Sequence, residues 1–218
     1  MHDGAAQIFR FVHDARLMVG TKATAALSSA YLNALEHARS RVQGRTLADR
    51  SDRTAPSVPL VEHPDVARML LGAKTATEGL RALVLYTASL LDPDGDARRA
   101  ELLLPLAKGY AAERANEQLA ALFQVVGGAA FTRDLPYEQY LRDVRVDTVY
   151  EGTTGVQALD LLLRQIDRDD AVALDSLLTD VEADANAHDG SGFAEERAAL
   201  AHAVLDLRST VDALRAML

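Results

Sequence analysis

The sequence predicts an all-α fold, arranged as an up-and-down helical bundle. Six prolines divide the 218 residues, and the stretches between them are long and rich in Ala and Leu, which favour helices. Apolar residues recur there at steps of three and four, the period of a helix that buries one face. The longest run with a strand-like pattern is VRVDTVY. Because long amphipathic segments joined by short breaks pack antiparallel, we expect about four to six helices.

The first two helices are expected at residues 3–41 and 64–91. In the first, the periodic apolar residues predict one long buried face, which Gly20 interrupts. The polar stretch QGRTLADRSDRTAPSVPLVEHP has no period and predicts a loop, and Pro64 suits the first turn of the next helix. The periodic residues of the first helix are Ile8, Phe11, Ala15, Met18, Val19, Ala26, Ala30 and Leu35.

A third helix is expected at residues 97–126, after the turn DPDGD. Pro105 either kinks this helix or marks its start. The following stretch to Gly155 combines paired glycines with a proline, so it predicts a connection without a long helix. Functional residues are often found in such connections.

A fourth helix is expected at residues 154–166 and is followed by the charged break DRDD. Residues 171–187 and 194–217 predict a helical hairpin around HDGSG.

Composition excludes several classes of protein. The net charge of -9 and the pI of about 5.1, without a cluster of basic and aromatic residues, argue against nucleic-acid binding. Cysteine is absent, and the histidines show no HxxxH or HExxH spacing, so no metal site is expected. No run of 18 apolar residues predicts a membrane helix, and the start MHDGAAQIFR lacks the layout of a secretory signal, so we expect a cytoplasmic protein.

One stretch carries a specific motif, QVVGGAAFTRDLPYEQYLRDVRVDTVYEGTTGVQ. It resembles the C-terminal helical domain of flavin-dependent acyl-CoA dehydrogenases, whose pattern is Q-x-x-G-G-x-G-[FY], a P-x-E turn, then R-D-x-[RK]-x-x-x-I-Y-E-G-T. Upstream, HDARLMVG and HARSRVQGR resemble two further family motifs. The stretch EHPDVARMLLGAKTATEGLRALVLYTA is similar to the longer subfamily that includes 3-methylmercaptopropionyl-CoA dehydrogenase-like enzymes.

The resemblance implies a division of the chain and a function. Residues 1–166 would form the bundle of this family and residues 167–218 part of its C-terminal extension. Family members carry an N-terminal helical domain and a middle β-domain before this region, so we expect the C-terminal part of an enzyme that forms the α,β-double bond of an acyl-CoA. The alternative is a non-catalytic helical module for oligomerisation or partner binding.

The resemblance assigns Glu151 as the base that removes the α-proton, while FAD takes a hydride from the β-carbon. Tyr150 would border the acyl slot, Gly152 would allow close backbone approach, and the N–H of Glu151 would donate to the thioester carbonyl. The alternative is that Glu151 and Thr153 only cap the helix that follows.

Four residues match family contacts to FAD. Arg41 would approach the cofactor's phosphates, and Gln124 and Gly128 would reach the FAD of a neighbouring subunit. Thr153 would lie near the flavin, although a role as the cap of the following helix would explain this threonine equally well. A solvated helix end is the alternative for Arg41 and for Gln124. Two departures weaken the match: Gln43 stands where an aromatic residue is expected, and Ala130 replaces the third glycine.

Arg16, with Asp14 beside it, matches the family arginine near the pantetheine and phosphates of coenzyme A. An ordinary salt bridge is the alternative. The expected partners are an acyl-CoA substrate, an electron acceptor of undetermined identity, and either identical subunits or a companion chain that supplies the missing domains.

Overall fold

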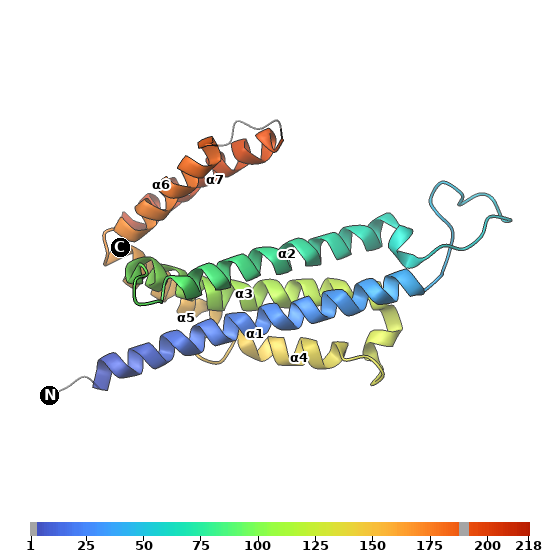
Figure 1. Cartoon of the computed structure of the whole chain (residues 1–218), viewed down its shortest axis with the longest axis horizontal. Coiled ribbons are helices and arrows are strands. Elements are labelled where there is room, and N and C mark those ends of the chain that lie inside the picture. Colours follow the sequence, from blue (N-terminus) through green and yellow to red (C-terminus); the bar gives the residue numbers. More distant parts are fainter. Residues whose placement is uncertain (1–3, 188–191) are drawn as a thin grey trace.

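The computed structural model of the chain, which describes residues 4–187 and 192–218, is mainly helical, with a long loop at residues 41–59 (Figure 1). No β-strand occurs in these ranges, where Val42 and Pro59 form one isolated antiparallel bridge. The all-α prediction is therefore confirmed, although the described residues form seven α-helices where about four to six were expected. The helices are α1 Gly4–Ser40, α2 Pro64–Ser89, α3 Ala97–Val126, α4 Tyr137–Asp147, α5 Thr154–Leu159, α6 Val172–Ala187 and α7 Ala194–Arg215, with shorter 3-10 turns η1 Leu60–Glu62 and η2 Gly127–Phe131 and a π-helix η3 Asp160–Asp167.

The four helices α1 to α4 run up and down, and α3 packs against the other three (Figure 1). The first three expected helices correspond to α1, α2 and α3, and their predicted boundaries lie within two residues of the observed ones. The predicted start of the first helix, Asp3, lies outside the described residues. None of the described helices combines the length and the apolar content needed to cross a membrane.

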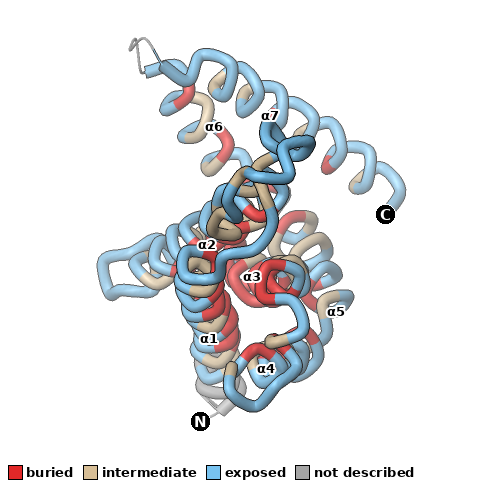
Figure 2. Tube along the Cα trace, turned by 90° about the vertical axis from the view of Figure 1, so that its right-hand side faces the viewer, coloured by how far each residue is buried: buried red, intermediate tan, exposed pale blue. Residues whose placement is uncertain are grey.

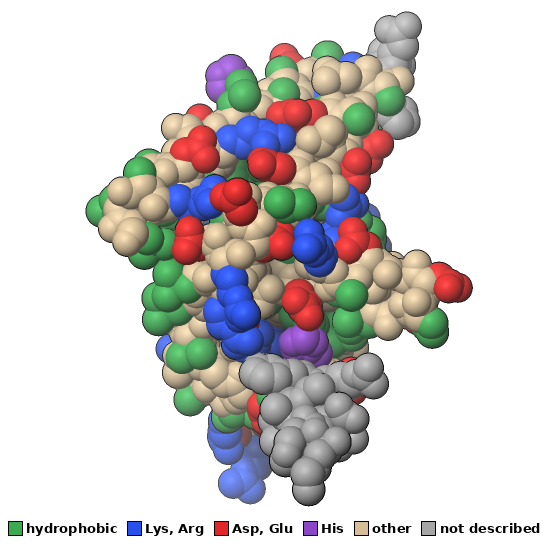
Figure 3. All heavy atoms as spheres, turned by 90° about the vertical axis from the view of Figure 1, so that its left-hand side faces the viewer, with side chains coloured by type: hydrophobic (Ala, Val, Ile, Leu, Met, Phe, Trp, Pro, Cys, Tyr) green, Lys and Arg blue, Asp and Glu red, His purple; other side chains and the backbone are tan. Residues whose placement is uncertain are grey.

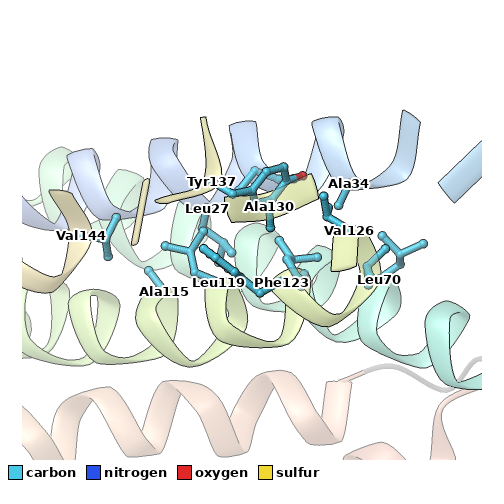
Figure 4. Close-up of a cluster of buried hydrophobic side chains, with 14 of the residues drawn as sticks. Leu27, Ala34, Leu70, Ala115, Leu119, Phe123, Val126, Ala130, Tyr137 and Val144 are labelled. Carbon is cyan, nitrogen blue, oxygen red and sulfur yellow. The ribbon is translucent and has the colours of Figure 1, made fainter. Parts of the chain in front are cut away.

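The buried residues lie on the faces where the helices meet (Figure 2). Many of the side chains in this main core are small. Four of the five buried α1 residues in this core are alanines, and the five are spaced by three and four residues, so the backbones of neighbouring helices can approach closely. Larger side chains from α2 and α3 fill the space between them, and Phe123 stacks edge-on against Tyr137 at a centroid distance of 6.0 Å (Figure 4). The α1 members are Ala23, Leu27, Ala30, Ala34 and Ala38.

Pro105 lies within α3 and does not mark its start. The helix begins at Ala97, where the side chain of Asp96 accepts a hydrogen bond from the N–H of Arg99 at 3.1 Å. Proline cannot donate to the carbonyl four residues earlier, but that carbonyl belongs to Glu101, which is exposed to water. The alternative that the helix starts at Pro105 is therefore wrong.

The connection after Val126 contains a helix, α4, that the sequence does not predict. Only Tyr137, Val144 and Asp147 of its 11 residues are buried, and the segment is short and polar overall, so its apolar period extends over only about two turns. The strand-like run VRVDTVY is helical as far as Asp147. Long-range bonds hold α4 in place: the Tyr137 hydroxyl donates to the carbonyl of Ala30 at 2.7 Å, and the Asn116 amide donates to that of Val144 at 3.1 Å.

The expected helix at residues 154–166 is present, but its second half is the π-helix η3. Beyond it, α6 and α7 form the predicted hairpin, which projects from one end of the bundle (Figure 1). Acidic and basic side chains alternate over this end (Figure 3). Among them Arg99 of α3 contacts Asp180 of α6 at 2.7 Å, which ties the hairpin to the bundle. A second apolar cluster lies beneath it, made by Leu102, Ile166, Ala171, Ala173, Leu174, Leu178, Val204 and Val211.

Candidate functional site

Glu151 lies in a tight turn between α4 and α5. Its φ angle is 55° and that of Gly152 is 95°, so two consecutive residues adopt left-handed backbone conformations. The cap of α5 is supplied by Thr153, whose hydroxyl oxygen accepts a hydrogen bond from the N–H of Val156 at 3.4 Å. The carboxylate of Glu151 is exposed and is not part of this cap.

The turn forms one wall of a groove against α1, with a volume of about 640 Å³. The groove brings Asp14, Tyr150 and Glu151 together, three of the residues that the sequence singles out. Phe11 and Met18 give it an apolar surface, and they are 68% and 71% exposed. The remaining lining residues are Ala15, Leu17, Val19, Thr21 and Lys22.

Lys22 adds a positive charge to this groove. Its ammonium group lies 2.8 Å from an oxygen of the buried Asp147 and donates to the carbonyl of Asp143 at 3.1 Å. It also stands 5.7 Å from the ring centre of Tyr150. Burial acts to lower the pKa of Lys22, but the hydrogen bond and the charge of Asp147 outweigh it, so the pKa is raised. Burial, followed by the charge of Asp147, raises the pKa of Tyr150.

Two side chains hold the same turn from inside the bundle. Lys108 of α3 is 0% exposed, and its ammonium group donates to the carbonyl of Gly152 at 2.5 Å. Burial lowers the pKa of Lys108, and the charge of Asp147 opposes that change in part. Gln157 of α5 donates to the carbonyls of Glu151 and Gly152 at 3.1 Å and 3.3 Å.

A second pocket, of about 440 Å³, brings together Arg41, Gln124 and Gly128. The end of α1, the loop after it and the end of α3 form this pocket. A Cβ atom added to Gly128 would meet no atom within 4 Å, so packing within this chain does not require glycine there. An exposed guanidinium, an exposed amide and open backbone suit the phosphates of a dinucleotide, so these residues fit FAD.

The two sites lie toward opposite ends of the bundle. Lys22 and Arg41 are 19 residues apart, which is about 28 Å at the rise of an α-helix. Thr153 lies in the Glu151 turn and does not line the second pocket. The four residues expected to contact FAD are therefore divided between two places.

Arg16 does not line the groove. It forms a buried ion pair with Asp160 of the π-helix at 2.5 Å, and Arg164 approaches the other oxygen of Asp160 to 3.3 Å. This is a salt bridge between helices, and a role of Arg16 toward coenzyme A remains a prediction. Among the residues that the structure describes, no group of three His, Asp or Glu is placed to hold a metal ion.

The sequence does not single out Lys22, Lys108, Asp147 or Gln157. For Lys108 a signal exists: it interrupts the apolar run LLLPLAKGYAA at a position whose neighbours Leu104, Ala111 and Ala112 are all buried. A helical pattern that places a lysine on the buried face indicates a specific partner for its charge.

The fold and the motif define a helical domain of a flavoenzyme family. Residues 44–166 match the family model described as "Acyl-CoA dehydrogenase, C-terminal domain". The chain therefore belongs to the acyl-CoA dehydrogenase family, and the resemblance stated from the sequence is confirmed.

Two relatives agree with this family, and a solved structure shares the fold. A broad-specificity linear acyl-CoA dehydrogenase of Mycobacterium tuberculosis is 44% identical over 98% of this chain and 37% of its own length. A 3-methylmercaptopropionyl-CoA dehydrogenase of Ruegeria pomeroyi is 41% identical over 77% of this chain and 30% of its own length. The chain thus spans about a third of these relatives. The structure of butyryl-CoA dehydrogenase from Megasphaera elsdenii matches 70% of this chain and 37% of its own with a TM-score of 0.60 and 24% identity, which is a likeness of fold.

Proposed function

We propose that the chain is the C-terminal part of an acyl-CoA dehydrogenase in which Glu151 removes the α-proton of the acyl thioester. The observation that supports this role is the left-handed turn, which leaves the Glu151 carboxylate exposed at the wall of a groove lined by apolar side chains of α1. An acyl chain suits such a lining, and a carboxylate beside it is placed to accept a proton.

Bound FAD supplies the chemistry that amino acids lack, because it accepts the hydride that leaves the β-carbon. The residues of this chain carry the rest of the reaction. Glu151 takes the proton and its backbone N–H donates to the thioester oxygen as negative charge develops there. Tyr150, which lines the groove beside it, borders the acyl chain. Asp14 and Arg16 lie on α1 and are assigned to the coenzyme A portion.

FAD is proposed to contact this chain at both sites. Thr153 can serve the flavin and still cap α5, because its oxygen accepts the bond from Val156 while its hydroxyl hydrogen remains available to donate. The pocket of Arg41, Gln124 and Gly128 is separated from the groove by about 28 Å along α1, the rise from Lys22 to Arg41, which supports the assignment of this pocket to the FAD of a neighbouring subunit. We therefore propose an oligomer.

Since the chain spans about a third of its relatives, the activity is assigned to the protein that combines it with the flavin-binding region. That region belongs either to the same polypeptide or to a companion. The alternative, a non-catalytic helical module, predicts that no flavin is retained when the two are produced together. Visible absorbance of the purified complex separates these outcomes.

The role of Glu151 is tested in the flavin-loaded enzyme by Glu151→Gln, which preserves shape but removes the proton acceptor. Excess acyl-CoA is mixed with the enzyme, and bleaching of the oxidised flavin band is followed by stopped flow. We expect reduction to slow by a factor of about 10²–10⁴, with substrate still bound. Glu117→Gln, at an exposed glutamate of α3 paired with Arg114, is the matched control. A Glu151→Gln enzyme that reduces its flavin at the parental rate would refute the assignment.

A further inference from the structure

The turn that carries Glu151 is held by side chains from two helices behind it. The carbonyls of Glu151 and Gly152 both point inward, where they accept hydrogen bonds from Lys108 of α3 and Gln157 of α5. The amide of Gln157 reaches both carbonyls, and the ammonium group of Lys108 reaches that of Gly152 at 2.5 Å. With both carbonyls fixed inside, the side chain of Glu151 is left on the outer face, at the groove.

The backbone of the turn needs such support. Glu151 has a φ of 55°, a conformation that is unfavourable for a residue with a side chain and persists where its surroundings hold it. Gly152 follows with a φ of 95°, and a Cβ atom at this position would stand 2.6 Å from the Gln157 amide nitrogen. We call the hydrogen bonds from Lys108 and Gln157 to these two carbonyls the clamp. The clamp requires glycine after Glu151, and it fixes the direction in which the side chain of Glu151 points.

Lys108 is costly to place here. It is 0% exposed, and its hydrogen bond goes to a neutral carbonyl. Burying an ammonium group disfavours its charged form, and the charge of Asp147 offsets that effect only in part. A methionine of similar length would fill the same space without this desolvation, and the Gly152 carbonyl would keep the hydrogen bond from Gln157 at 3.3 Å. Stability alone therefore does not account for a lysine at this position.

We propose that Lys108, together with Gln157, is a positioning residue for the reaction, because it holds the Glu151–Gly152 backbone so that the carboxylate faces the acyl groove. Lys108 does not touch the substrate in this proposal. Its contribution reaches the reaction through the direction of Glu151, so the inference rests on the proposed role of Glu151 as the base.

The experiment compares Lys108→Met with the parent in the flavin-loaded enzyme. We expect the unfolding midpoint to stay about equal, because relief of the desolvated charge offsets the lost hydrogen bond to a carbonyl that Gln157 still reaches. Amide hydrogen exchange at residues 150–154 should become at least tenfold faster, since the turn loses a holding bond. The dissociation constant for acyl-CoA should change by less than about twofold, while flavin reduction at saturating acyl-CoA slows by roughly 10-fold to 100-fold. Lys74→Met, at an exposed lysine of α2, is the matched control and should change none of these quantities.

A second variant tests the clamp independently. Gln157→Met removes the donor to both carbonyls, and we expect the same pattern of faster exchange, retained acyl-CoA binding and slower reduction. Unchanged exchange and unchanged reduction in Lys108→Met overturn the inference. So does a Lys108→Met protein that is less stable than the parent, because that result assigns Lys108 to folding.

Glu151→Gln, measured in parallel, separates this inference from the proposed function. If Glu151→Gln slows reduction and Lys108→Met does not, Glu151 remains the base and only the role of Lys108 is refuted. If Glu151→Gln reduces its flavin at the parental rate, the proposed function fails first, and the inference about Lys108 fails with it.

Discussion

Gly20 of α1 lies directly against the carbonyl oxygen of Ala107 in α3. A Cβ atom on Gly20 would stand 2.0 Å from that oxygen, far inside van der Waals contact. The glycine that weakens the helix prediction for α1 is therefore the residue that lets the two longest helices of the bundle meet.

Gly20→Ala should force α1 and α3 apart and lower the free energy of unfolding by about 1–3 kcal/mol or more. The control is Gly79→Ala, at an exposed position of α2 where an added Cβ meets no atom within 4 Å. That change should stabilise the protein by about 0.4–1 kcal/mol, because alanine favours the helix. Urea denaturation measures both, and equal effects at the two sites would contradict the close contact.

Tyr137→Phe should destabilise the protein by about 0.5–1.5 kcal/mol at pH 8, because its hydroxyl donates to the carbonyl of Ala30 inside the core. Burial raises the pKa of Tyr137. The unfolded chain can therefore ionise this tyrosine while the folded chain still holds it neutral. Its contribution to stability is complete below the unfolded pKa of about 10 and is lost as the pH rises above that value.

Urea denaturation of Tyr137→Phe across this pH range tests the linkage. Stability should fall less steeply above pH 10 in Tyr137→Phe than in the parent. Tyr110→Phe, at an exposed tyrosine of α3, should leave stability at pH 8 unchanged. If the free energy of unfolding falls with pH equally steeply in the parent and in Tyr137→Phe above about pH 10, the linkage is contradicted.

Asp160→Asn should be strongly destabilising, by about 3–5 kcal/mol, because it leaves the buried guanidinium of Arg16 without its counter-charge. The double variant Arg16→Met with Asp160→Leu removes both charges and should recover most of the loss. Denaturation of Arg16→Met, of Asp160→Leu and of the double variant measures their coupling. If the double variant is as unstable as the sum of the single changes, the two residues do not act as a pair.

Arg41→Gln should weaken flavin retention without changing the unfolding midpoint, because Arg41 is exposed and lines the pocket assigned to a neighbouring subunit's FAD. Loss of a charge-assisted hydrogen bond, about 1.5–3 kcal/mol, corresponds to a roughly 10-fold to 100-fold higher dissociation constant. Flavin absorbance per chain after dilution and gel filtration measures the flavin that each variant retains. Arg142→Gln, at an exposed arginine of α4, is the control. Equal retention in both variants would exclude Arg41 from the cofactor site.

The sequence predicts the long helices well because each repeats its apolar residues over many turns. α4 carries the same period in Tyr137, Tyr140, Leu141 and Val144, but over only about two turns of a segment that is polar overall, which is too short a run to predict a helix. Its place in the bundle depends on bonds to residues more than 25 positions away, such as Asn116 and Ala30. The π-helical half of the fourth predicted helix is also hidden, because one additional residue in a turn leaves the apolar pattern nearly unchanged.

The sequence motif indicates the residues that line the groove and the pocket. It does not indicate the residues that hold the Glu151 turn from inside the bundle. Asp14, Tyr150 and Glu151 share a groove, and Arg41, Gln124 and Gly128 share a pocket, as residues of one motif set should. Lys108 and Gln157 are 49 residues apart and meet only at the carbonyls of the Glu151 turn. No local spacing can indicate a contact that α3 and α5 create by packing.

The π-helix has a consequence for the far end of the molecule. A π-helix winds more residues into each turn than an α-helix, so the eight residues Asp160–Asp167 turn the chain through a smaller angle than the same residues would at the α-helical advance of about 100° per residue. If this segment became α-helical at the same length, Asp180 would turn away from Arg99, and the hairpin of α6 and α7 would leave the bundle in another direction. The orientation of the hairpin thus depends on the π-helical winding of eight residues.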